Sequence, residues 1–336
     1  MAKLSEVAAR AGVSNTTVSR YLNHKIALPK DTRDRIDQAV QALNYRPNLL
    51  AQRLSKGRAN AICLVTPDIA NPFFAELAAV IEAKAALRGY SVYIVATHGE
   101  KEKEVEVFSN LENRHADGLI FATSQTDCSH LYDFLHAHKN VILLDEAIPE
   151  TETGTVVVDN VQGAYLGTKH LIDLGHRDIA FVGGPQKIHS GAGRLQGFRD
   201  AMSEAKIPVN EAHVFSHEYS ETFGYEAGQK LLEQENRPTA IMAASDILVF
   251  GLLRALKGHE VQVPQDISIV GFDDIPFVDL IDPALTTIHQ PIQDLGGTAL
   301  DNLIALLEGG PSCGQICLPV ELIQRSSTQP FKAGTK

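Results

Sequence analysis

The sequence is poor in cysteine: its 336 residues contain four, and these lack the paired spacing of a disulfide framework. No apolar run approaches the roughly 18 residues that a membrane-spanning helix needs. The first ten residues, MAKLSEVAAR, lack the apolar centre of a secretory signal. These features exclude a disulfide-stapled secreted domain and an integral membrane protein. We therefore expect a protein of the reducing cytoplasm that has no membrane partner.

Motifs for a metal ion or an organic cofactor are missing as well. Cys313 and Cys317 are separated by three residues and have no second ligand pair nearby, so a zinc site is not expected. The stretch GAGRLQG (191–197) has the wrong glycine spacing for a dinucleotide-binding loop, and no strand directly precedes it. Because no nucleophile with a partner base is recognisable either, we expect no cofactor, no metal and no catalytic activity.

What the sequence does contain is a strongly uneven charge. The whole chain carries −11, yet residues 1–60 hold eleven Lys and Arg against four Asp and Glu, a net charge of +7. The rest of the chain therefore carries −18. A basic segment on an acidic body indicates a polyanionic partner for that segment alone. A merely solvated basic face is the alternative.

The basic segment has the pattern of three short helices. Apolar residues recur at helical spacing in LSEVAARA (4–11) and again in DTRDRIDQAVQALNY (31–45). Between them Gly12-Val13-Ser14 supplies a turn, and Ser14 an N-cap, for a second helix in which Val18, Tyr21 and Leu22 share one face. A helix, a short glycine-containing turn and a second helix form the helix-turn-helix arrangement, whose second helix enters the DNA major groove. The sequence thus predicts a DNA-binding head.

The segment RPNLLAQRLSKGRAN (46–60) follows this head. Pro47 is expected to end the third helix, and Gly57 closes a segment of about nine residues. A helix that short is marginal in water by itself. We therefore expect it to fold only against a partner surface, such as DNA or a second copy of the chain.

From Ala61 onwards short apolar runs alternate with amphipathic helical stretches. The runs are AICLVT (61–66), SVYIVA (91–96), GLIFA (118–122), VILLD (141–145), IAFVGG (179–184), AIMAAS (240–245) and ISIVGF (267–272). Strands that are apolar throughout and alternate with helices are typical of parallel sheets covered on both faces. Roughly 270 residues exceed one such sheet. We expect two doubly wound lobes, with a ligand at the carboxyl ends of the strands and between the lobes.

Head, hinge and body together resemble the LacI/GalR-type family of bacterial transcriptional regulators, from Leu4 to about Pro330. The most specific stretch is VAARAGVSNTTVSRYLN followed by LNYRPNLLAQRL. In family order there follow NPFF, VVVDN, LIDLGHRDIAFVGGP, GRLQGF, SDILVFG, VPQDISIVGFDD and LTTIHQP. The resemblance implies an all-α helix-turn-helix head plus an α/β periplasmic-binding-protein-like core with two doubly wound parallel-sheet lobes. It also implies a homodimer on a near-palindromic operator of double-stranded DNA, and a small effector.

The resemblance also sets the expected boundaries. The head takes residues 1–46, the hinge helix and linker 47–59, and the effector-binding core 60–336. Within the core, lobe 1 takes residues 60–160 and 291–321, and lobe 2 takes 161–290 and 322–330. The chain is expected to cross between the lobes near Asn160–Gln162, His289–Pro291 and Glu321–Gln324.

On the second helix, Asn15, Thr16 and Arg20 carry base-reading chemistry. An amide can pair with adenine, a guanidinium with guanine, and threonine with the thymine methyl group. The residues expected to hold phosphates are Ser14, Thr17, Ser19, Asn23 and Thr32. In the hinge, the resemblance implies that Leu54 wedges into the minor groove; packing between two hinge helices is the alternative. Its expected neighbours on the sugar-phosphate walls are Asn48, Gln52, Arg53 and Lys56.

For the effector, the resemblance implies a set of polar and aromatic residues in the cleft: Asn71, Phe73, Phe74, Ser124, Asp145, Asp159, Arg194, Tyr219, Asp246 and Gln290. Carboxylates, amides and a guanidinium suit vicinal hydroxyl groups, and aromatic rings suit the apolar face of a sugar. Two alternatives stay open: the phenylalanines pack into their own lobe, or Arg194 and Asp246 form an ion pair between the lobes. Glu146 stands where many sugar-binding relatives have a basic residue, which weakens a direct inference of pentose recognition.

The sequence as a whole predicts a sequence-specific DNA-binding transcriptional regulator. We expect a repressor of a carbohydrate-utilisation operon whose operator affinity is set by a sugar-like effector, either an inducer or a corepressor. Alternatives in the same class are a nucleoside or purine effector, and an activator. A sugar-binding protein without a DNA role is disfavoured by the basic head. An enzyme on the same lobes is disfavoured by the missing catalytic motif.

Overall fold

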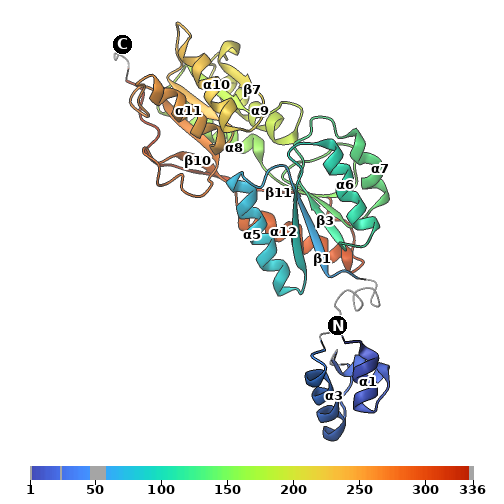
Figure 1. Ribbon diagram of the computed structural model, residues 1–336. Coiled ribbons are helices and arrows are strands. Elements are labelled where there is room, and N and C mark those ends of the chain that lie inside the picture. The colour runs from blue at the N-terminus through green and yellow to red at the C-terminus, as the bar shows by residue number, and fades with distance from the viewer. Residues whose placement is uncertain (1, 23–24, 46–57, 333–336) are drawn as a thin grey trace. The chain divides into compact units, whose positions relative to one another are not determined.

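The computed structural model describes residues 2–22, 25–45 and 58–332 (Figure 1). The chain divides into two compact units, Met1–Ala59 and Asn60–Lys336. Each unit has a hydrophobic core of its own. The two units are therefore described separately, as the head and the core.

The head consists of three helices around a small apolar centre. They are α1 (Leu4–Ala11), α2 (Asn15–Leu22) and α3 (Lys30–Ala42). Val7, Val18 and Ile36, one from each helix, are fully buried against one another. The Tyr21 hydroxyl donates a hydrogen bond to the Asp37 carboxylate at 3.0 Å, which fastens α2 to α3. The apolar face predicted for the second helix is thus the face that packs.

The turn between α1 and α2 has the chemistry that the sequence predicts. Gly12 adopts a left-handed backbone, with φ of 68°, and the N–H of Val13 donates to the carbonyl of Ala8 at 3.1 Å. Such a glycine ends a helix without the steric cost that a side chain would add. The Ser14 hydroxyl accepts from the N–H of Thr17 at 3.1 Å. The predicted N-cap of the second helix is confirmed.

The third helix ends earlier than predicted. The sequence suggested that it runs to residue 45 and stops at Pro47, whereas α3 ends at Ala42. Asn44 is left-handed, with φ of 45°, and the N–H of Tyr45 donates to the carbonyl of Val40 at 2.9 Å. Asparagine tolerates this conformation because its short polar side chain bonds locally. A left-handed turn at Asn44 therefore ends the helix, three residues before the predicted last residue, 45.

The core contains two six-stranded sheets. The first has the order β11-β5-β4-β3-β1-β2. Its strands are β1 (Ala61–Thr66), β2 (Ser91–Ala96), β3 (Gly118–Phe121), β4 (Val141–Leu144), β5 (Gly154–Val158) and β11 (Gln315–Leu318). The second has the order β12-β10-β9-β8-β6-β7. Its strands are β6 (Ile179–Gly183), β7 (Val214–Ser216), β8 (Ala240–Ala243), β9 (Ser268–Asp273), β10 (Thr286–His289) and β12 (Glu321–Ile323).

Helices cover both faces of each sheet. Around the first sheet lie α5 (Pro72–Leu87), α6 (Lys101–Glu112), the short 3-10 turn η1 (Ser129–Leu131), α7 (Tyr132–Ala137) and α12 (Ile292–Leu307). Around the second lie α8 (Asn160–Asp173), α9 (His189–Glu204), η2 (Glu211–His213), α10 (Glu221–Leu232) and α11 (Asp246–Gly258). The packing places α5 with α12 on one face of the first sheet, and α8 with α9 on one face of the second. The predicted fold class is confirmed.

The sequence pattern found seven of the twelve strands in the described part of the chain, with the edge strand β2 among them. Every apolar run that it identified forms a strand, whereas β5, β7, β10, β11 and β12 were not predicted as strands. The edge strand β12 pairs antiparallel with β10, in contrast to the parallel pairs elsewhere in the two sheets. Edge strands such as β11 and β12 carry exposed side chains on one side. They therefore lack the continuous apolar run that marks a buried parallel strand.

Three passages of the chain join the lobes. The first lies between β5 and α8, and the second between β10 and α12. The third lies at residues 319–320, between β11 and β12, whereas the sequence placed it at Glu321–Gln324. Glu321 already pairs with His289 inside the second sheet. Because β12 binds β10 directly, the crossing is completed before this pairing begins.

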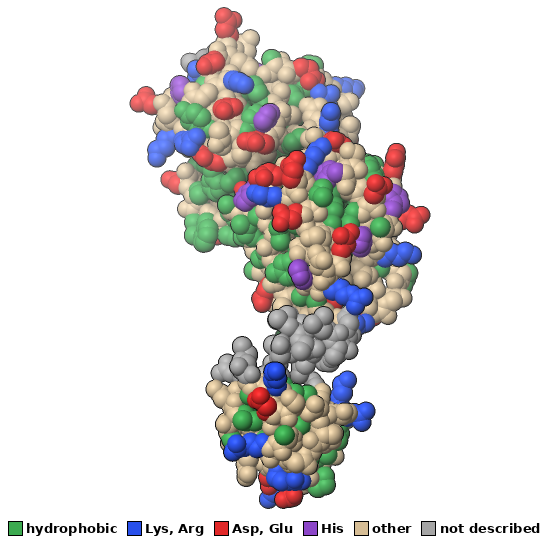
Figure 2. Space-filling view, turned by 45° about the vertical axis from the view of Figure 1, so that its right-hand side comes forward, with side chains coloured by type: hydrophobic (Ala, Val, Ile, Leu, Met, Phe, Trp, Pro, Cys, Tyr) green, Lys and Arg blue, Asp and Glu red, His purple; other side chains and the backbone are tan. Residues whose placement is uncertain are grey.

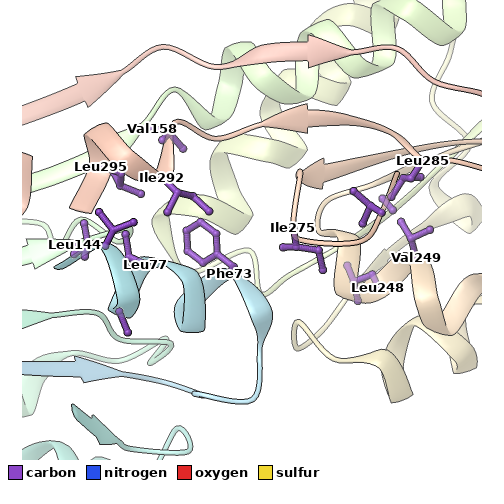
Figure 3. Close-up of a cluster of buried hydrophobic side chains, with 14 of the residues drawn as sticks. Phe73, Leu77, Leu144, Val158, Leu248, Val249, Ile275, Leu285, Ile292 and Leu295 are labelled. Carbon is purple, nitrogen blue, oxygen red and sulfur yellow. The ribbon is translucent and has the colours of Figure 1, made fainter. Parts of the chain in front are cut away.

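One cluster of buried apolar side chains continues from lobe 1 into lobe 2. Figure 3 shows Phe73, Leu77 and Ile292 on the side of lobe 1, and Ile275 and Leu248 on the side of lobe 2. Phe73 and Ile275 are 4% and 2% exposed, so the apolar contact between the lobes excludes water. This contact supports the cavity that lies beside it.

Candidate functional sites

The second helix of the head presents a polar face to solvent. Asn15, Thr16 and Arg20 are exposed, whereas Val18 on the opposite face is fully buried. Lys and Arg side chains are spread over the surface of the head, with few acidic ones among them (Figure 2). Exposed amide, hydroxyl and guanidinium groups on a rigid helix can form hydrogen bonds to base edges. The face that the sequence selected as base-reading is therefore free to meet DNA.

The residues predicted to hold phosphates are partly engaged within the head. The hydroxyls of Ser14 and Thr17 lie 2.8 Å apart and bond to each other. The hydroxyl of Thr32 accepts from Nη2 of Arg35 at 3.5 Å, and Ser19 is half-buried. These groups sit at or near helix N-termini or on the helix surface, where they can still approach a phosphate. The remaining predicted DNA contacts lie outside the described residues: Asn23, Asn48, Gln52, Arg53, Leu54 and Lys56.

In the core, a cavity of about 480 Å³ lies between the lobes, at the carboxyl ends of the strands of both sheets. Lobe 1 supplies the start of α5 and the loops after β1, β2, β3 and β4. Lobe 2 supplies the start of α9 and the loops after β6, β7, β8 and β9. Ligands of open parallel sheets bind at these ends because the loops there converge. The volume suits a molecule the size of a sugar.

Three residues on the cavity wall have left-handed backbones. The φ angles are 54° for His98, 69° for Asp145 and 115° for Asp273. For residues with a side chain this conformation costs on the order of 1 kcal/mol or more, and it persists where the surrounding structure enforces it. Each of the three lies at or just beyond the end of a strand. The turn after the strand thus directs a polar side chain into the cavity.

Arg194 of α9 occupies the floor of the cavity. Its Nε donates to Oδ1 of Asn160 at 2.8 Å, and its Nη1 donates to the carbonyl of Ala244 at 2.6 Å. Its guanidinium lies 3.8 Å from the ring centre of Phe272. Arg194 is only 3% exposed, and a buried guanidinium of this kind requires several partners. The arginine is therefore held in one orientation by the protein itself.

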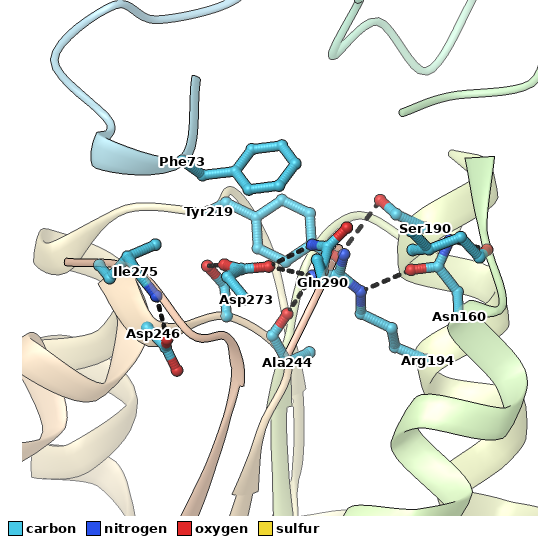
Figure 4. A network of polar contacts seen from close by, with 12 residues as sticks. Phe73, Asn160, Ser190, Arg194, Tyr219, Ala244, Asp246, Asp273, Ile275 and Gln290 are labelled. Atoms are coloured by element: carbon cyan, nitrogen blue, oxygen red, sulfur yellow. Dashed lines mark hydrogen bonds and ion pairs between the residues drawn. The ribbon is translucent and has the colours of Figure 1, made fainter. Parts of the chain in front are cut away.

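Asp273 is the carboxylate that faces this arginine. Its Oδ1 accepts from Nη1 of Arg194 at 3.4 Å and from Nε2 of Gln290 at 2.7 Å, and its Oδ2 accepts from the Ser245 hydroxyl at 2.5 Å. Figure 4 shows Arg194, Asp273 and Gln290 converging near Tyr219. Burial raises the pKa of Asp273, and the charge of Arg194 opposes that rise. Residues of lobe 2, together with Gln290 in the passage between β10 and α12, thereby form a preorganised polar floor of the cavity.

Lobe 1 contributes two adjacent buried acids, Asp145 and Glu146. Burial raises the pKa of Asp145 to about 6 and that of Glu146 to about 8. Glu146 accepts from the Ser190 N–H at 3.0 Å, and its other oxygen bonds the Ser190 hydroxyl. Ser190 belongs to the first turn of α9, which has no side-chain cap of its own. A carboxyl group of lobe 1 therefore caps a helix of lobe 2.

The structure brings eight of the ten predicted effector residues to the cavity wall: Asn71, Phe73, Phe74, Ser124, Asp145, Arg194, Tyr219 and Gln290. The other two, Asp159 and Asp246, do not line this cavity. Asp159 caps α8, because its Oδ1 accepts from the N–H of Gln162 at 2.9 Å. Asp246 is fully buried and accepts from the Thr287 hydroxyl at 2.7 Å and from the N–H of Ile275 at 3.1 Å. Both carboxylates are engaged in structural contacts outside the cavity.

The two alternatives raised by the sequence are resolved differently. Arg194 pairs with Asp273, which also belongs to lobe 2, and not with Asp246, as the alternative had it. Phe73 packs into the apolar cluster of its own lobe and also borders the cavity. Phe74 meets Phe73 edge-on, with ring centres 5.1 Å apart and planes at 74°. The aromatic pair is thus a wall anchored in lobe 1.

Several wall residues were not selected from the sequence: His98, Thr123, Glu146, Ser190, Ser245 and Asp273. His98, Thr123, Ser245 and Asp273 stand at or just after an apolar run, so the rule that ligands bind at strand ends could have found them. Glu146 was noted only as a departure from relatives. No local signal identifies Ser190, because it reaches the cavity through a contact with the other lobe.

The described residues contain neither a metal-binding cluster nor a membrane-spanning helix. Within residues 2–22, 25–45 and 58–332, no group of three or more His, Cys, Asp or Glu side chains is arranged to hold a metal ion. Over these ranges no helix combines the length and the apolar composition that a bilayer crossing requires. The cavity between the lobes is therefore described by its hydrogen-bonding groups alone.

The head has three helices, with a polar face on the second, and the core has two lobes with a cavity between them. These two features are typical of DNA-binding regulators that carry a ligand-binding core. Residues 3–48 match the family described as bacterial regulatory proteins, lacI family, and residues 168–328 match the periplasmic binding protein-like domain. The chain is similar to the transcriptional regulator DegA of Bacillus subtilis, with 37% identity over 97% of this chain and 98% of that one. The chain belongs to the lacI family of bacterial regulatory proteins and is a DNA-binding transcriptional regulator.

Solved structures have the same fold. A crystal structure of the lac repressor dimer, bound to operator and to the anti-inducer ONPF, superimposes with a TM-score of 0.88 at 30% identity, covering 98% of this chain and 99% of that one. A LacI family transcriptional regulator from Enterococcus faecium with bound ribose has a TM-score of 0.73 at 31% identity, covering 81% of this chain and all of that one. The family predicted from the sequence is confirmed.

Proposed function

We propose that this protein represses a carbohydrate-utilisation operon and that a small sugar-like effector, bound in the cavity between the lobes, controls its affinity for the operator. The lining of the cavity is the main support for this proposal, because its floor has oriented donors and acceptors and its wall has aromatic rings. Vicinal hydroxyl groups need such fixed partners, and the apolar face of a sugar packs on a ring. A related regulator has been solved with bound ribose.

The head supplies the operator contacts in this proposal. Asn15, Thr16 and Arg20 read base edges, and the hinge predicted at residues 47–59 supplies minor-groove contacts through Leu54. The exposure of the α2 polar face supports the first part, and the net charge of +7 over residues 1–60 supports contact with a polyanion. We place the protein in the bacterial cytoplasm, at the nucleoid when it is bound, and assign it no enzymatic activity.

A homodimer on a near-palindromic operator completes the proposal. Large apolar side chains on the core surface are exposed: Ile69 at 40%, Leu87 at 86% and Ile94 at 44% on lobe 1, and Phe277 at 71% and Leu280 at 74% on lobe 2. Hydrophobic side chains gather over part of the core surface in Figure 2. Exposed apolar groups of this size favour burial against a partner. A dimer made by two identical surfaces presents two heads to two symmetric half-sites.

The effector acts in this scheme by changing how the lobes close on each other. The Glu146–Ser190 contact joins lobe 1 to α9 of lobe 2, so a ligand that alters the closure also alters this contact. A ligand that favours one state by about 1.4 kcal/mol changes operator affinity tenfold. The change in closure is transmitted to the hinge segments of the dimer. The state of these segments decides whether both heads can bind the operator at the same time.

The experiment has two stages. The purified full-length protein is first used to select operator sequences from random DNA, and we expect a palindromic consensus with two half-sites. Operator affinity is then measured with and without a panel of pentoses, hexoses, polyols, sugar acids, sugar phosphates, nucleosides and purines. A change of tenfold or more with one sugar class supports the proposal. A response only to nucleosides or purines contradicts the sugar assignment, and a consensus without symmetry contradicts the dimer.

A further inference from the structure

The cavity between the lobes has a pronounced excess of acidic groups. Five acids lie on its wall: Asp68, Asp145, Glu146, Glu218 and Asp273. Among the residues that form this wall, the Lys and Arg side chains amount to Arg194 alone. Arg194 is already committed to Asn160, the carbonyl of Ala244 and Asp273. Glu146 keeps its proton near neutral pH, but an anionic ligand would still meet the other carboxylates without a free counter-charge to bind it.

Two buried acceptors in this wall have no donor within the described part of the chain. They are Oδ1 of Asp145 and Oε1 of Gln290, and the two residues are only 9% and 0% exposed. A buried acceptor without a donor costs free energy, and native structures rarely retain one without a functional reason. Both residues border the cavity, so a ligand that brings donors would satisfy them. The ligand should accordingly be rich in donors on the side of Asp145.

We propose that the effector is a polyhydroxylated molecule carrying a protonated amine, such as an amino sugar, and that Asp145 is the carboxylate that binds the amine. This inference rests on the proposed function and names the chemical class of its effector. An ammonium group offers three donors and one positive charge, which match an orphaned carboxylate oxygen in an acidic cavity. Hydroxyl groups of the same molecule bond to Gln290 and the polar floor. A neutral sugar supplies the donors but offers no positive charge to the carboxylate of Asp145.

The other groups around Asp145 are consistent with this assignment. Arg194 and Asp273 act on it from lobe 2, and Glu146 is its neighbour on lobe 1. Arg194 donates its hydrogen bonds to Asn160, Ala244 and Asp273 and makes none to Asp145. The carboxylate of Asp145 can therefore still attract a cationic group of the ligand. Because burial raises the pKa of Asp145 to about 6, a bound cation should drive this carboxyl to ionise. Binding of an amine near pH 6 is therefore coupled to proton release.

The test compares matched probes on the full-length protein. Dissociation constants are measured by calorimetry for D-glucosamine, D-glucose, N-acetyl-D-glucosamine and D-glucuronate, and for the corresponding galactose series. N-acetylation keeps the nitrogen and removes its charge, so it separates charge from shape. We expect the amino sugar of one series to bind at least tenfold more tightly than its neutral and N-acetylated forms, and the uronate to bind most weakly. Calorimetry at pH 6 in two buffers of different ionisation enthalpy should show proton release for the amine alone.

Variants locate the charge that is recognised. Asp145→Asn should weaken binding of the amino sugar at least tenfold, reduce binding of the neutral sugar far less, and abolish the proton release. The control is Asp133→Asn, which removes an exposed charge from α7 and should change no dissociation constant. We expect Asp145→Asn to fold, because an amide replaces a carboxyl of the same shape. The thermal melt of the unliganded variant checks this.

The outcomes separate this inference from the proposed function. If a neutral or an anionic sugar binds as tightly as the matched amine, or if Asp145→Asn affects all probes alike, the amine assignment is wrong and a sugar-responsive repressor remains. If the protein binds its operator but none of the sugars of any charge binds the core, both the amine assignment and the sugar effector are wrong.

Discussion

Individual side chains on α2 divide by exposure into anchors and the groups that we propose to contact DNA. Val18 is inaccessible to solvent and Tyr21 is tied to Asp37, so the orientation of the helix is fixed from behind. Arg20 and Asn15 on the other face are exposed. Because the helix is already held rigidly, binding does not have to spend free energy on ordering its polar side chains. A small number of such groups is then enough to discriminate between bases.

Arg20→Ala tests the base-reading role directly. We expect a loss of about 1–3 kcal/mol of operator-binding free energy and a relaxed preference at one base position of each half-site, because a bidentate donor to a base is removed. Binding to an operator library, read out by sequencing, measures both effects. The matched control is Arg10→Ala, which removes an exposed charge from α1 and should weaken all sequences alike. An unchanged consensus for Arg20→Ala would falsify the assignment of α2.

Glu146 makes the stability of the core depend on pH. Burial raises its pKa to about 8 in the folded protein, above the ordinary value of 4.5 that applies to the unfolded chain. The folded state therefore holds a proton that the unfolded state has lost, and the free energy of unfolding falls as pH rises from about 5 to beyond 8. One pKa unit corresponds to about 1.4 kcal/mol, so the total effect is on the order of a few kcal/mol.

Glu146→Gln should remove most of this dependence. The amide keeps the contact with Ser190 but does not ionise, so we expect the variant to match the wild type at pH 5.5 and to exceed its stability at pH 8.5. Denaturant titration at the two pH values measures the difference. Glu102→Gln, at an exposed position of α6, should leave the pH dependence of the wild type intact. The same dependence in Glu146→Gln as in the wild type would rule out this carboxyl as its source.

At the scale of elements, the cavity floor depends on how closely α8 and α9 approach. Gly197 of α9 faces the backbone of α8, where an added Cβ would collide with the carbonyl oxygen of Val161 and lie 2.8 Å from the nitrogen of Tyr165. This close approach brings Nε of Arg194 to within 2.8 Å of Oδ1 of Asn160, at the start of α8. The absence of a side chain at Gly197 therefore positions the arginine on which the floor is built.

Gly197→Ala should destabilise the core by about 1–3 kcal/mol, because overpacking forces the two helices apart. It should also weaken effector binding through displacement of Arg194. Gly258→Ala is the matched control: this glycine also lies in a helix, α11, and no atom lies within 4 Å of an added Cβ. Alanine there should be neutral or slightly stabilising. Chemical denaturation of both variants measures the contrast, and equal stabilities would show that the helix pair tolerates a wider separation.

At the scale of the whole molecule, the division into two units carries a prediction about folding. The boundary lies between Ala59 and Asn60, and each unit has its own apolar centre. A fragment covering residues 58–336 should therefore fold alone, because its core does not draw on the head. We expect its thermal transition to coincide with that of the core in the full-length protein, and its effector affinity to be unchanged.

The same fragment should lose operator binding entirely, since the basic charge and the recognition helix are removed. Calorimetry of the fragment and a gel-shift assay measure the two properties. A fragment that aggregates, or that melts well below the core transition of the intact chain, would mean that the units stabilise each other. The experiment also tests the core boundary expected from the sequence, which places the start of the core at residue 60.

The sequence by itself determined the local elements and the family. Helical periodicity identified α1 and the packing face of α2, and the glycine turn between them, because these features depend on residues a few positions apart. Continuous apolar runs identified seven of the strands, the edge strand β2 included, for the same reason. The order of motifs along the chain then identified a regulator with a head and a two-lobed core, and eight residues of the cavity wall.

Only the tertiary structure decided which charges face the cavity. Asp246 is held by Thr287, 41 residues away, and Glu146 by Ser190, 44 residues away. Partners at such distances leave no periodic signal, so the sequence chose Asp246 where the folded chain uses Asp273. The short edge strands β11 and β12 were missed because exposed side chains interrupt their apolar pattern. A carboxylate's role depends on what surrounds it in space, and that surrounding is set when distant segments pack together.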